Sequence, residues 1–310
     1  MNRRQALGGL AASIAAGVLV TPGRADASTD ALFPTSLALP DGFPPEGIAI
    51  GALPYAFFGS RLDGSIYRAS LLTGEGRVIS PGPGTQSLGL KLDAHGRLFV
   101  SGGSAGDARV VNAVTGEVIV SYRFTASPSF VNDVVLTPHG AYFTDSLNPF
   151  LYVLPFGPGG SLPGPDSFVR LPLTGDLVFG PGLNTNGISR TPDGVALLTI
   201  QSNTGRLFRV DSGGATTAVD LAGESLANGD GLLVHGQTLF AVQNRLNTVA
   251  VVRMSVDGRS GTVVQRITDS RFDIPTTVAA FGPRLYLPNA RFTTAPTPTT
   301  PYTAVAIARP

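Results

Sequence analysis

NDVVLTPHGAYFTDS, residues 132–146, contains a short apolar strand, a turn with Gly140, and a second apolar strand. The same strand–turn–strand pattern occurs six times along the 310 residues, and its first residue recurs at intervals of 42, 44, 54, 44 and 46. Those first residues are Glu46, Leu88, Asn132, Asn186, Asp230 and Thr276. Paired short strands that repeat with a period in the forties are typical of propeller blades. The sequence therefore predicts an all-β fold, a six-bladed β-propeller.

The ends of the chain predict how this propeller closes. The sixth repeat supplies three strands, the last of them YTAVAIAR (302–309), and then the chain runs out. TSLALP (35–40), just before the first repeat, is the expected outer strand of the last blade. A ring closed in this way leaves no open sheet edge. The long interval of 54 contains a Gly/Pro-rich loop at 157–167, expected at the outer part of the third blade.

Composition excludes several classes of function. The chain has 39 Gly, 25 Pro and only 14% charged residues, a profile that suits an all-β protein with many turns. It has no Cys, which excludes disulfides, thiolate metal sites and a thiol nucleophile. Lys91 is the single lysine, so neither a basic nucleic-acid surface nor Schiff-base chemistry is expected. We expect a monomer that acts on a small molecule, without nucleic-acid partners.

The first 27 residues predict an export signal. Arg3 and Arg4 precede the weakly apolar stretch LGGLAASIAAGVLV and an A-x-A sequence at residues 25–27. This order is typical of a cleaved signal and not of a membrane anchor, and the paired arginines favour the twin-arginine route. We therefore expect residues 28–310 to form one propeller domain located in the periplasm or outside the cell. The mature chain would carry 19 basic and 20 acidic side chains.

The first position of each repeat predicts a ring of oxygen ligands. Inner strands run down the central channel of a propeller, so equivalent positions meet at one end of it. Four of the six positions carry a carboxylate or an amide: Glu46, Asn132, Asn186 and Asp230. Such a set suits a hard divalent cation, calcium first, although magnesium, manganese or zinc would be tolerated. The alternative is that these residues only start strands as turn formers, which explains each one singly but not their common register.

The histidines are expected at the opposite end of the channel. His95, His139 and His235 each precede a glycine in the turn after the inner strand. The fourth repeat has Asp193 before Gly194 at the same place, which indicates turn residues. A histidine-rich metal site and a histidine base are therefore not expected.

At these residues the chain resembles the senescence marker protein/gluconolactonase/regucalcin family, which is related to paraoxonases and diisopropyl-fluorophosphatase. The resemblance covers residues 36–308, and its specific parts are PEGI (45–48), residues 132–146, TNGISRTPDG (185–194) and GDGL (229–232). It implies that Glu46, Asn186 and Asp230 hold a divalent cation. It also implies that Asn132 is a ligand or a substrate contact and that Asp230 takes part in proton transfer.

One departure from the family bears on the substrate. Sugar-lactone members carry an arginine two residues before the blade-three asparagine, and Phe130 stands there in this chain. A less polar lactone or ester is therefore a better candidate than a sugar lactone. Arg61, Arg245 and Arg291 could supply a cation at the same mouth, and Gln243 also lies at this end.

Three functions remain open from the sequence. The first is an exported, metal-dependent hydrolase of lactones or related esters, with Asp230 and Asn132 as catalytic residues. The second is a non-catalytic binding propeller in which calcium ties the blades together, because the fold alone does not decide function. The third is a condensing enzyme similar to strictosidine synthase, which would not require a metal.

Overall fold

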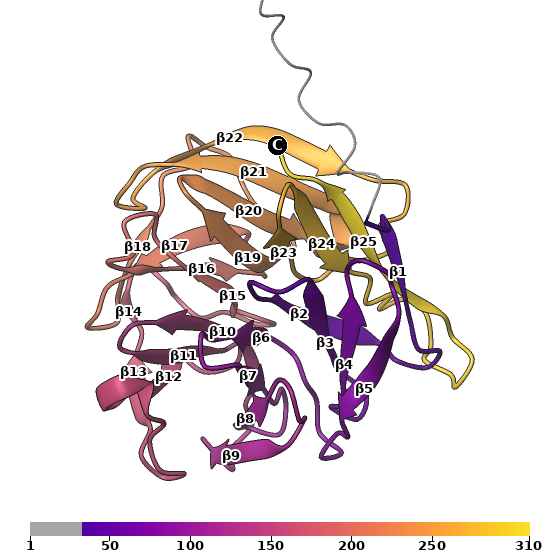
Figure 1. The fold of residues 1–310 in the computed structure, drawn as a ribbon. Helices are drawn as coiled ribbons and strands as arrows, with labels where there is room; N and C mark the ends of the chain where they lie inside the picture. Colours follow the sequence, from indigo (N-terminus) through magenta and orange to yellow (C-terminus); the bar gives the residue numbers. More distant parts are fainter. Residues whose placement is uncertain (1–32) are drawn as a thin grey trace, which may run out of the picture. The chain divides into compact units, whose positions relative to one another are not determined.

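The computed structural model describes residues 33–310, which form one compact unit. Six antiparallel sheets are arranged around a centre, as Figure 1 shows, and each sheet is one blade. The six-bladed propeller that the repeats predict is confirmed. The predicted export signal lies outside the described residues. None of the described segments is a helix that is both long and apolar enough to span a membrane.

Blades 1, 2 and 3 pair their strands in chain order from the centre outward. Blade 1 contains β2 (Pro45–Ile50), β3 (Tyr55–Ser60), β4 (Ile66–Ser70) and β5 (Gly76–Ser80). Blade 2 contains β6 (Leu90–Leu92), β7 (Arg97–Ser101), β8 (Asp107–Asn112) and β9 (Val118–Arg123). Blade 3 contains β10 (Val131–Thr137), β11 (Gly140–Asp145), β12 (Phe150–Pro155) and β13 (Val169–Pro172).

The second half of the ring repeats this pattern with one addition. Blade 4 contains β15 (Thr185–Arg190), β16 (Leu197–Gln201), β17 (Arg206–Val210) and β18 (Ala215–Ala218), and the two-residue β14 (Thr174–Gly175) adds a parallel edge. Blade 5 contains β19 (Gly229–His235), β20 (Thr238–Gln243), β21 (Thr248–Met254) and β22 (Gly261–Thr268). Blade 6 contains β23 (Ala279–Phe281), β24 (Arg284–Pro288), β25 (Tyr302–Ala308) and β1 (Ser36–Leu39).

Closure of the ring follows the prediction. β1 pairs antiparallel with β25, from Ser36 opposite Val305 to Leu39 opposite Tyr302, so the first strand of the chain completes its last blade. The two strands lie side by side in Figure 1, one indigo and one yellow. The Gly/Pro-rich loop lies between β12 and β13, at the outer part of blade 3 as expected, and includes a short 3-10 turn, η2 (Pro158–Gly160).

The hydrophobic core is divided into six clusters, one between each pair of neighbouring blades. Between blades 2 and 3 it is aromatic, and the rings of Phe124 and Tyr152 stack at 4.5 Å. Between blades 6 and 1, Leu37 and Leu39 of β1 pack with Phe58. Burial of apolar area is the main contribution to the stability of the fold, so the closing strand β1 stabilises the propeller through its buried leucines.

Two inner strands are shorter than the repeat predicts. β6 starts at Leu90 and β23 at Ala279, so Leu88 and Thr276 precede their strands. Blades 2 and 6 are also the two blades whose first position carries neither a carboxylate nor an amide.

Candidate metal and catalytic site

A β-bulge sets the position of each of the four candidate ligands. In blade 1 the pairing passes from Pro45–Ser60 to Ile48–Phe58, which leaves Glu46 and Gly47 opposite a single residue. The same shift occurs in blades 3, 4 and 5, at Asn132, Asn186 and Asp230. A bulge re-aims the side chains of the extra residue. The common register seen in the sequence therefore corresponds to a common irregularity of the inner strands.

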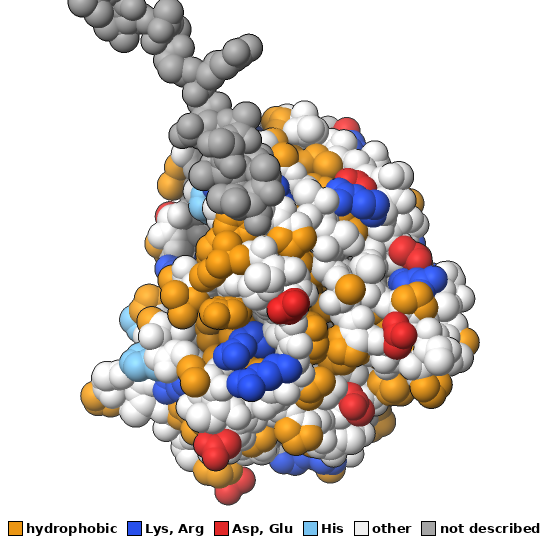
Figure 2. Space-filling model, turned by 45° about the vertical axis from the view of Figure 1, so that its right-hand side comes forward, with side chains coloured by type: hydrophobic (Ala, Val, Ile, Leu, Met, Phe, Trp, Pro, Cys, Tyr) orange, Lys and Arg blue, Asp and Glu red, His pale blue; other side chains and the backbone are white. Residues whose placement is uncertain are grey.

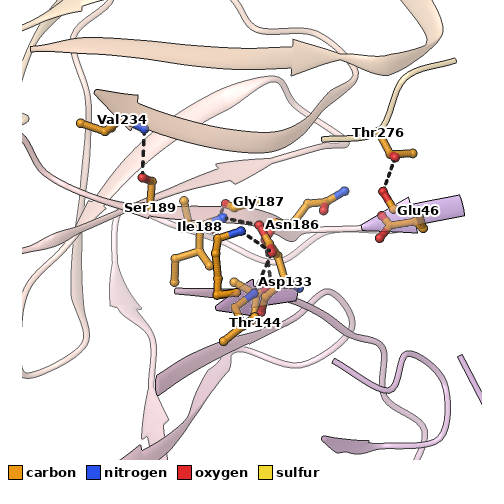
Figure 3. Close-up of polar contacts among 12 residues, drawn as sticks. Glu46, Asp133, Thr144, Asn186, Gly187, Ile188, Ser189, Val234 and Thr276 are labelled. Atoms are coloured by element: carbon orange, nitrogen blue, oxygen red, sulfur yellow. Dashed lines mark hydrogen bonds and ion pairs between the residues drawn. The ribbon is translucent and has the colours of Figure 1, made fainter. Parts of the chain in front are cut away.

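Hydrogen bonds join the inner ends of neighbouring blades into a ring. Gly89 donates its N–H to the carbonyl of Asn132 at 2.9 Å, and Gly231 donates to the carbonyl of Thr276 at 2.8 Å. The Thr276 hydroxyl in turn donates to the carbonyl of Glu46 at 2.6 Å, a bond drawn in Figure 3. Thr276 thus closes blade 6 onto blade 1, a role that its place in the repeat did not reveal.

Glycines let the inner strands of blades 4 and 5, and of blades 1 and 2, approach each other closely next to the ring positions. A Cβ on Gly187 would clash with the carbonyl oxygen of Asp230, and one on Gly47 would clash with that of Leu88. Between blades 3 and 4 the Thr144 hydroxyl donates to the carbonyl of Asn186 at 2.8 Å. The residue after the ring position is therefore glycine in four blades because the next backbone leaves no room for a side chain.

The two candidate asparagines have fixed amide orientations. The Nδ2 of Asn132 donates to Ser146 at 3.0 Å, and the Nδ2 of Asn186 donates to Ser202 at 3.1 Å. No described residue donates a hydrogen bond to the Oδ1 of either side chain, and both side chains are buried. Two amide oxygens are thus left as free acceptors, as a cation site requires.

The two candidate carboxylates are buried and repel each other. Burial raises the pKa of the Glu46 carboxyl well above its usual range, and the charges of Asp230 and Asp133 raise it further. Burial raises the pKa of Asp230 to about 7, although a hydrogen bond from Asn244 at 2.6 Å opposes the shift. No described residue forms a hydrogen bond or an ion pair with the Glu46 carboxylate. Lys91 and Arg61 oppose the shift of Glu46 only in part, and buried carboxylates with so little compensation are the electrostatic pattern of a cation site.

These observations fit a hard divalent cation held by Glu46, Asn132, Asn186 and Asp230, all of which are oxygen donors. Within residues 33–310, no three His, Cys, Asp or Glu side chains are grouped to hold a metal ion. Two of the four candidate ligands are amides, so the site differs from one built only from acidic side chains or imidazoles. The assignment of these four ligands remains a prediction.

Asp133 and Lys91 form a charged pair beside the ring that the sequence reasoning missed. The Asp133 carboxylate accepts the N–H groups of Val134 at 2.8 Å and of Ile188 at 3.2 Å, the latter visible in Figure 3. The Lys91 ammonium lies 3.6 Å from its Oδ1. The sequence does mark Asp133 as unusual, because it occupies a position that is glycine in four other blades.

Replacing Lys91 with Met should lower the free energy of unfolding of the calcium-free protein by roughly 1–2 kcal/mol, because Asp133 would lose the only cation that pairs with it among the described residues. The effect stays below that of a fully buried pair because the lysine side chain is 27% exposed. Urea unfolding measures it, with Lys91→Arg as the control that keeps the charge. Equal stability of wild type and Lys91→Met would show that the pair is fully screened.

The tentative substrate residues separate into two groups. Arg61 is half-buried at the mouth, with its guanidinium carbon 5.2 Å from the centre of the Phe292 ring, and Arg245 is exposed beside Phe292 in a pocket of about 190 Å³. Phe130 is half-buried, next to the strand that carries Asn132. Gln243 and Arg291 serve the fold instead, as their contacts show.

Gln243 is buried, and its Nε2 donates to the carbonyl of Ala227 at 2.9 Å. Arg291 pairs with Asp273 at 2.8 Å and donates to the carbonyl of Pro301 at 2.7 Å. Both side chains thereby hold loops at this end of the propeller, while the buried Oε1 of Gln243 forms no hydrogen bond with a described residue.

The histidines lie at the ends of the inner strands opposite to the ring. His95 follows β6 and lies in the β6–β7 turn, 3.6 Å from Asp93, and His139 lies between β10 and β11. Gly96, Gly194 and Gly236 adopt positive φ, whereas the residues before them, His95, Asp193 and His235, do not. The turn assignment is confirmed, and in three of the four turns the glycine takes the left-handed conformation, whereas Gly140 begins β11.

Comparison with known proteins shows the fold. No family model matches the sequence. No curated protein matches it either. The allergen Mala s 1 of Malassezia sympodialis superimposes with a TM-score of 0.70 at 15% identity, over 88% of this chain and 96% of that one. The calcium-binding protein regucalcin from Agrobacterium tumefaciens does so with a TM-score of 0.61 at 16% identity, over 90% of this chain and 96% of that one.

This chain has the regucalcin-like propeller fold. Virginiamycin B lyase from Staphylococcus aureus is also similar in fold, with a TM-score of 0.57 at 11% identity over 88% of this chain and 99% of that one. The regucalcin-like propeller that the motifs predict is thus confirmed at the level of the fold. The neighbours include a calcium-binding protein and a lyase, so the chemistry must be argued from the residues of this chain.

Proposed function

We propose that the protein is an exported, calcium-dependent hydrolase of lactones or related esters, acting as a monomer on a small molecule. The observation that carries the proposal is the pair of buried carboxylates, Glu46 and Asp230, whose pKa values are raised at a ring that also presents two free amide oxygens. A bound divalent cation would polarise the substrate carbonyl and lower the pKa of a nearby water.

Residues of the chain would supply the proton acceptor and the contacts that orient the substrate. Asp230, a buried carboxylate that accepts a hydrogen bond from Asn244 at 2.6 Å, would accept a proton from the attacking water. Asn132, whose amide is fixed by Ser146, can direct its Oδ1 to the cation or to the substrate. Phe130 beside it would favour an apolar acyl group over a sugar.

The surface supports a small, diffusible substrate. On the face drawn in Figure 2, basic and acidic side chains are scattered among uncharged and hydrophobic ones, without a wide area of one sign. A polyanion or a charged membrane would instead require a continuous basic face. We propose the location outside the cytoplasm from the N-terminal sequence alone.

A panel of lactones and aryl esters, assayed with calcium and with a chelator, tests the proposal. We expect hydrolysis that the chelator abolishes and added calcium restores. Calcium that raises the melting temperature without any turnover would support the non-catalytic binding propeller instead. Turnover that is insensitive to the chelator would indicate chemistry without a required metal.

A further inference from the structure

The Arg61 guanidinium is half-buried and forms neither a hydrogen bond nor an ion pair with another described residue. Its Nε is buried and forms no hydrogen bond, and the guanidinium forms no ion pair with any described acid. Arg97, Arg266, Arg271 and Arg291, by contrast, each pair with a carboxylate within 2.8 Å. A buried donor without an acceptor is costly, and its retention needs an explanation.

The position of Arg61 connects it to the candidate site. It follows β3, and its own N–H donates to the carbonyl of Pro44, two residues before Glu46. Its charge lies near enough to Glu46 to lower the pKa of that carboxyl in part. The guanidinium therefore stands at the blade 1 side of the ring.

Phe292 links Arg61 to the pocket at the mouth. The guanidinium carbon of Arg61 lies 5.2 Å from the centre of the Phe292 ring, a cation–π contact that holds the side chain in place. Phe292 also lines the pocket of about 190 Å³, together with Asn186, Asn244 and Arg245. Arg245 lines this pocket directly, and the Arg61 guanidinium lies on the Phe292 ring that forms part of its wall.

We propose that Arg61 binds a carboxylate of the substrate, so that the preferred lactone or ester carries a free carboxyl group. The planar fork of arginine matches the two oxygens of a carboxylate, and the two terminal nitrogens of the half-buried Arg61 form no hydrogen bond or ion pair with a described residue. A doubly charged phosphate is less suitable because Glu46 and Asp230 would repel it more strongly. This inference rests on the proposed function for the reaction, but not for the binding.

Two matched pairs of compounds test it. γ-Butyrolactone and γ-butyrolactone-γ-carboxylic acid differ by one carboxylate and report turnover. 2-Pyrrolidinone and pyroglutamate differ in the same way, resist hydrolysis, and report binding by calorimetry to the calcium-loaded protein.

The variants are Arg61→Met and Arg61→Gln. The control is Arg68→Met, which removes an arginine that stacks on Tyr55 at 5.1 Å in the same blade.

We expect wild type to prefer the carboxylated member of each pair by roughly 10- to 100-fold, the range for a hydrogen bond to a charged group. Arg61→Met and Arg61→Gln should remove the preference and leave the neutral compound unchanged, while Arg68→Met should behave as wild type. Added salt should weaken the preference. Absence of a preference in wild type, or an equal loss for both members in the Arg61 variants, overturns the inference.

The outcomes separate this inference from the proposed function. Arg61-dependent binding of pyroglutamate without hydrolysis of any lactone would support the carboxylate site and reject the hydrolase. Calcium-dependent hydrolysis of neutral lactones that is indifferent to Arg61 would support the hydrolase and reject the carboxylate site. Unchanged melting temperatures of the Arg61 variants confirm that the comparison is made on folded protein.

Discussion

Asp230→Ala should abolish both turnover and the stabilisation by calcium. The change removes one of two buried carboxylates at the ring and also the proposed proton acceptor, so a fall in kcat/KM of at least about 10³-fold is expected. Calcium at about 100 times its Kd should stabilise wild type by roughly 2.7 kcal/mol and the variant by much less. Steady-state kinetics and thermal unfolding with and without calcium measure the two effects.

Two further variants make this test specific. Asp230→Asn keeps the size of the side chain and removes only the charge, so it should lose activity while remaining folded. Asp166→Ala removes the same charge from an exposed site with no described contact and should behave as wild type. Activity retained by Asp230→Asn would reject Asp230 as proton acceptor, and unchanged calcium stabilisation would reject it as a ligand.

The fold could be predicted because the repeat is a property of the backbone. Alternating apolar residues and glycine turns specify strands and hairpins locally. The sixth repeat lacks an outer strand, and the segment before the first repeat supplies one. β14 escaped prediction because its two residues, Thr174 and Gly175, pair in parallel with β18 and leave no local pattern. The late starts of β6 and β23 were missed because the repeat gives the register of a strand but not the residue at which its pairing begins.

The site was predictable only where it follows the repeat. The four ligand positions share a register, so the sequence could align them without knowing their side-chain directions. The contacts of Asp133 with Lys91 and of Arg61 with Phe292 join residues 42 and 231 positions apart in the sequence, through loops or different blades. No periodic pattern reports such contacts. Gln243 and Arg291 were placed at the correct end but turned toward loops, because alternation gives the end of a strand and not the partner of a side chain.

The stability of the calcium-free protein should fall as pH rises, which is the reverse of ordinary acid denaturation. Glu46 and Asp230 have pKa values raised by burial above the reference values of 4.5 and 3.8. The folded chain therefore binds more protons than the unfolded chain between those values and the raised ones. Their contribution to stability is complete below the reference values and is lost as pH rises through the raised values, about 7 for Asp230. We expect a loss of roughly 2–4 kcal/mol between pH 5 and pH 8.

Calcium should reverse this dependence, because it binds the deprotonated carboxylates and releases protons. The gain in melting temperature with calcium should thus be small at pH 5 and large at pH 8. Glu46→Gln isolates the cause: without calcium the variant should be more stable than wild type at pH 8, and calcium should stabilise it less. Glu75→Gln, at an exposed site, provides the matched control. If calcium-free wild type is instead more stable at pH 8 than at pH 5, the two carboxylates are not the uncompensated buried charges that a cation would neutralise.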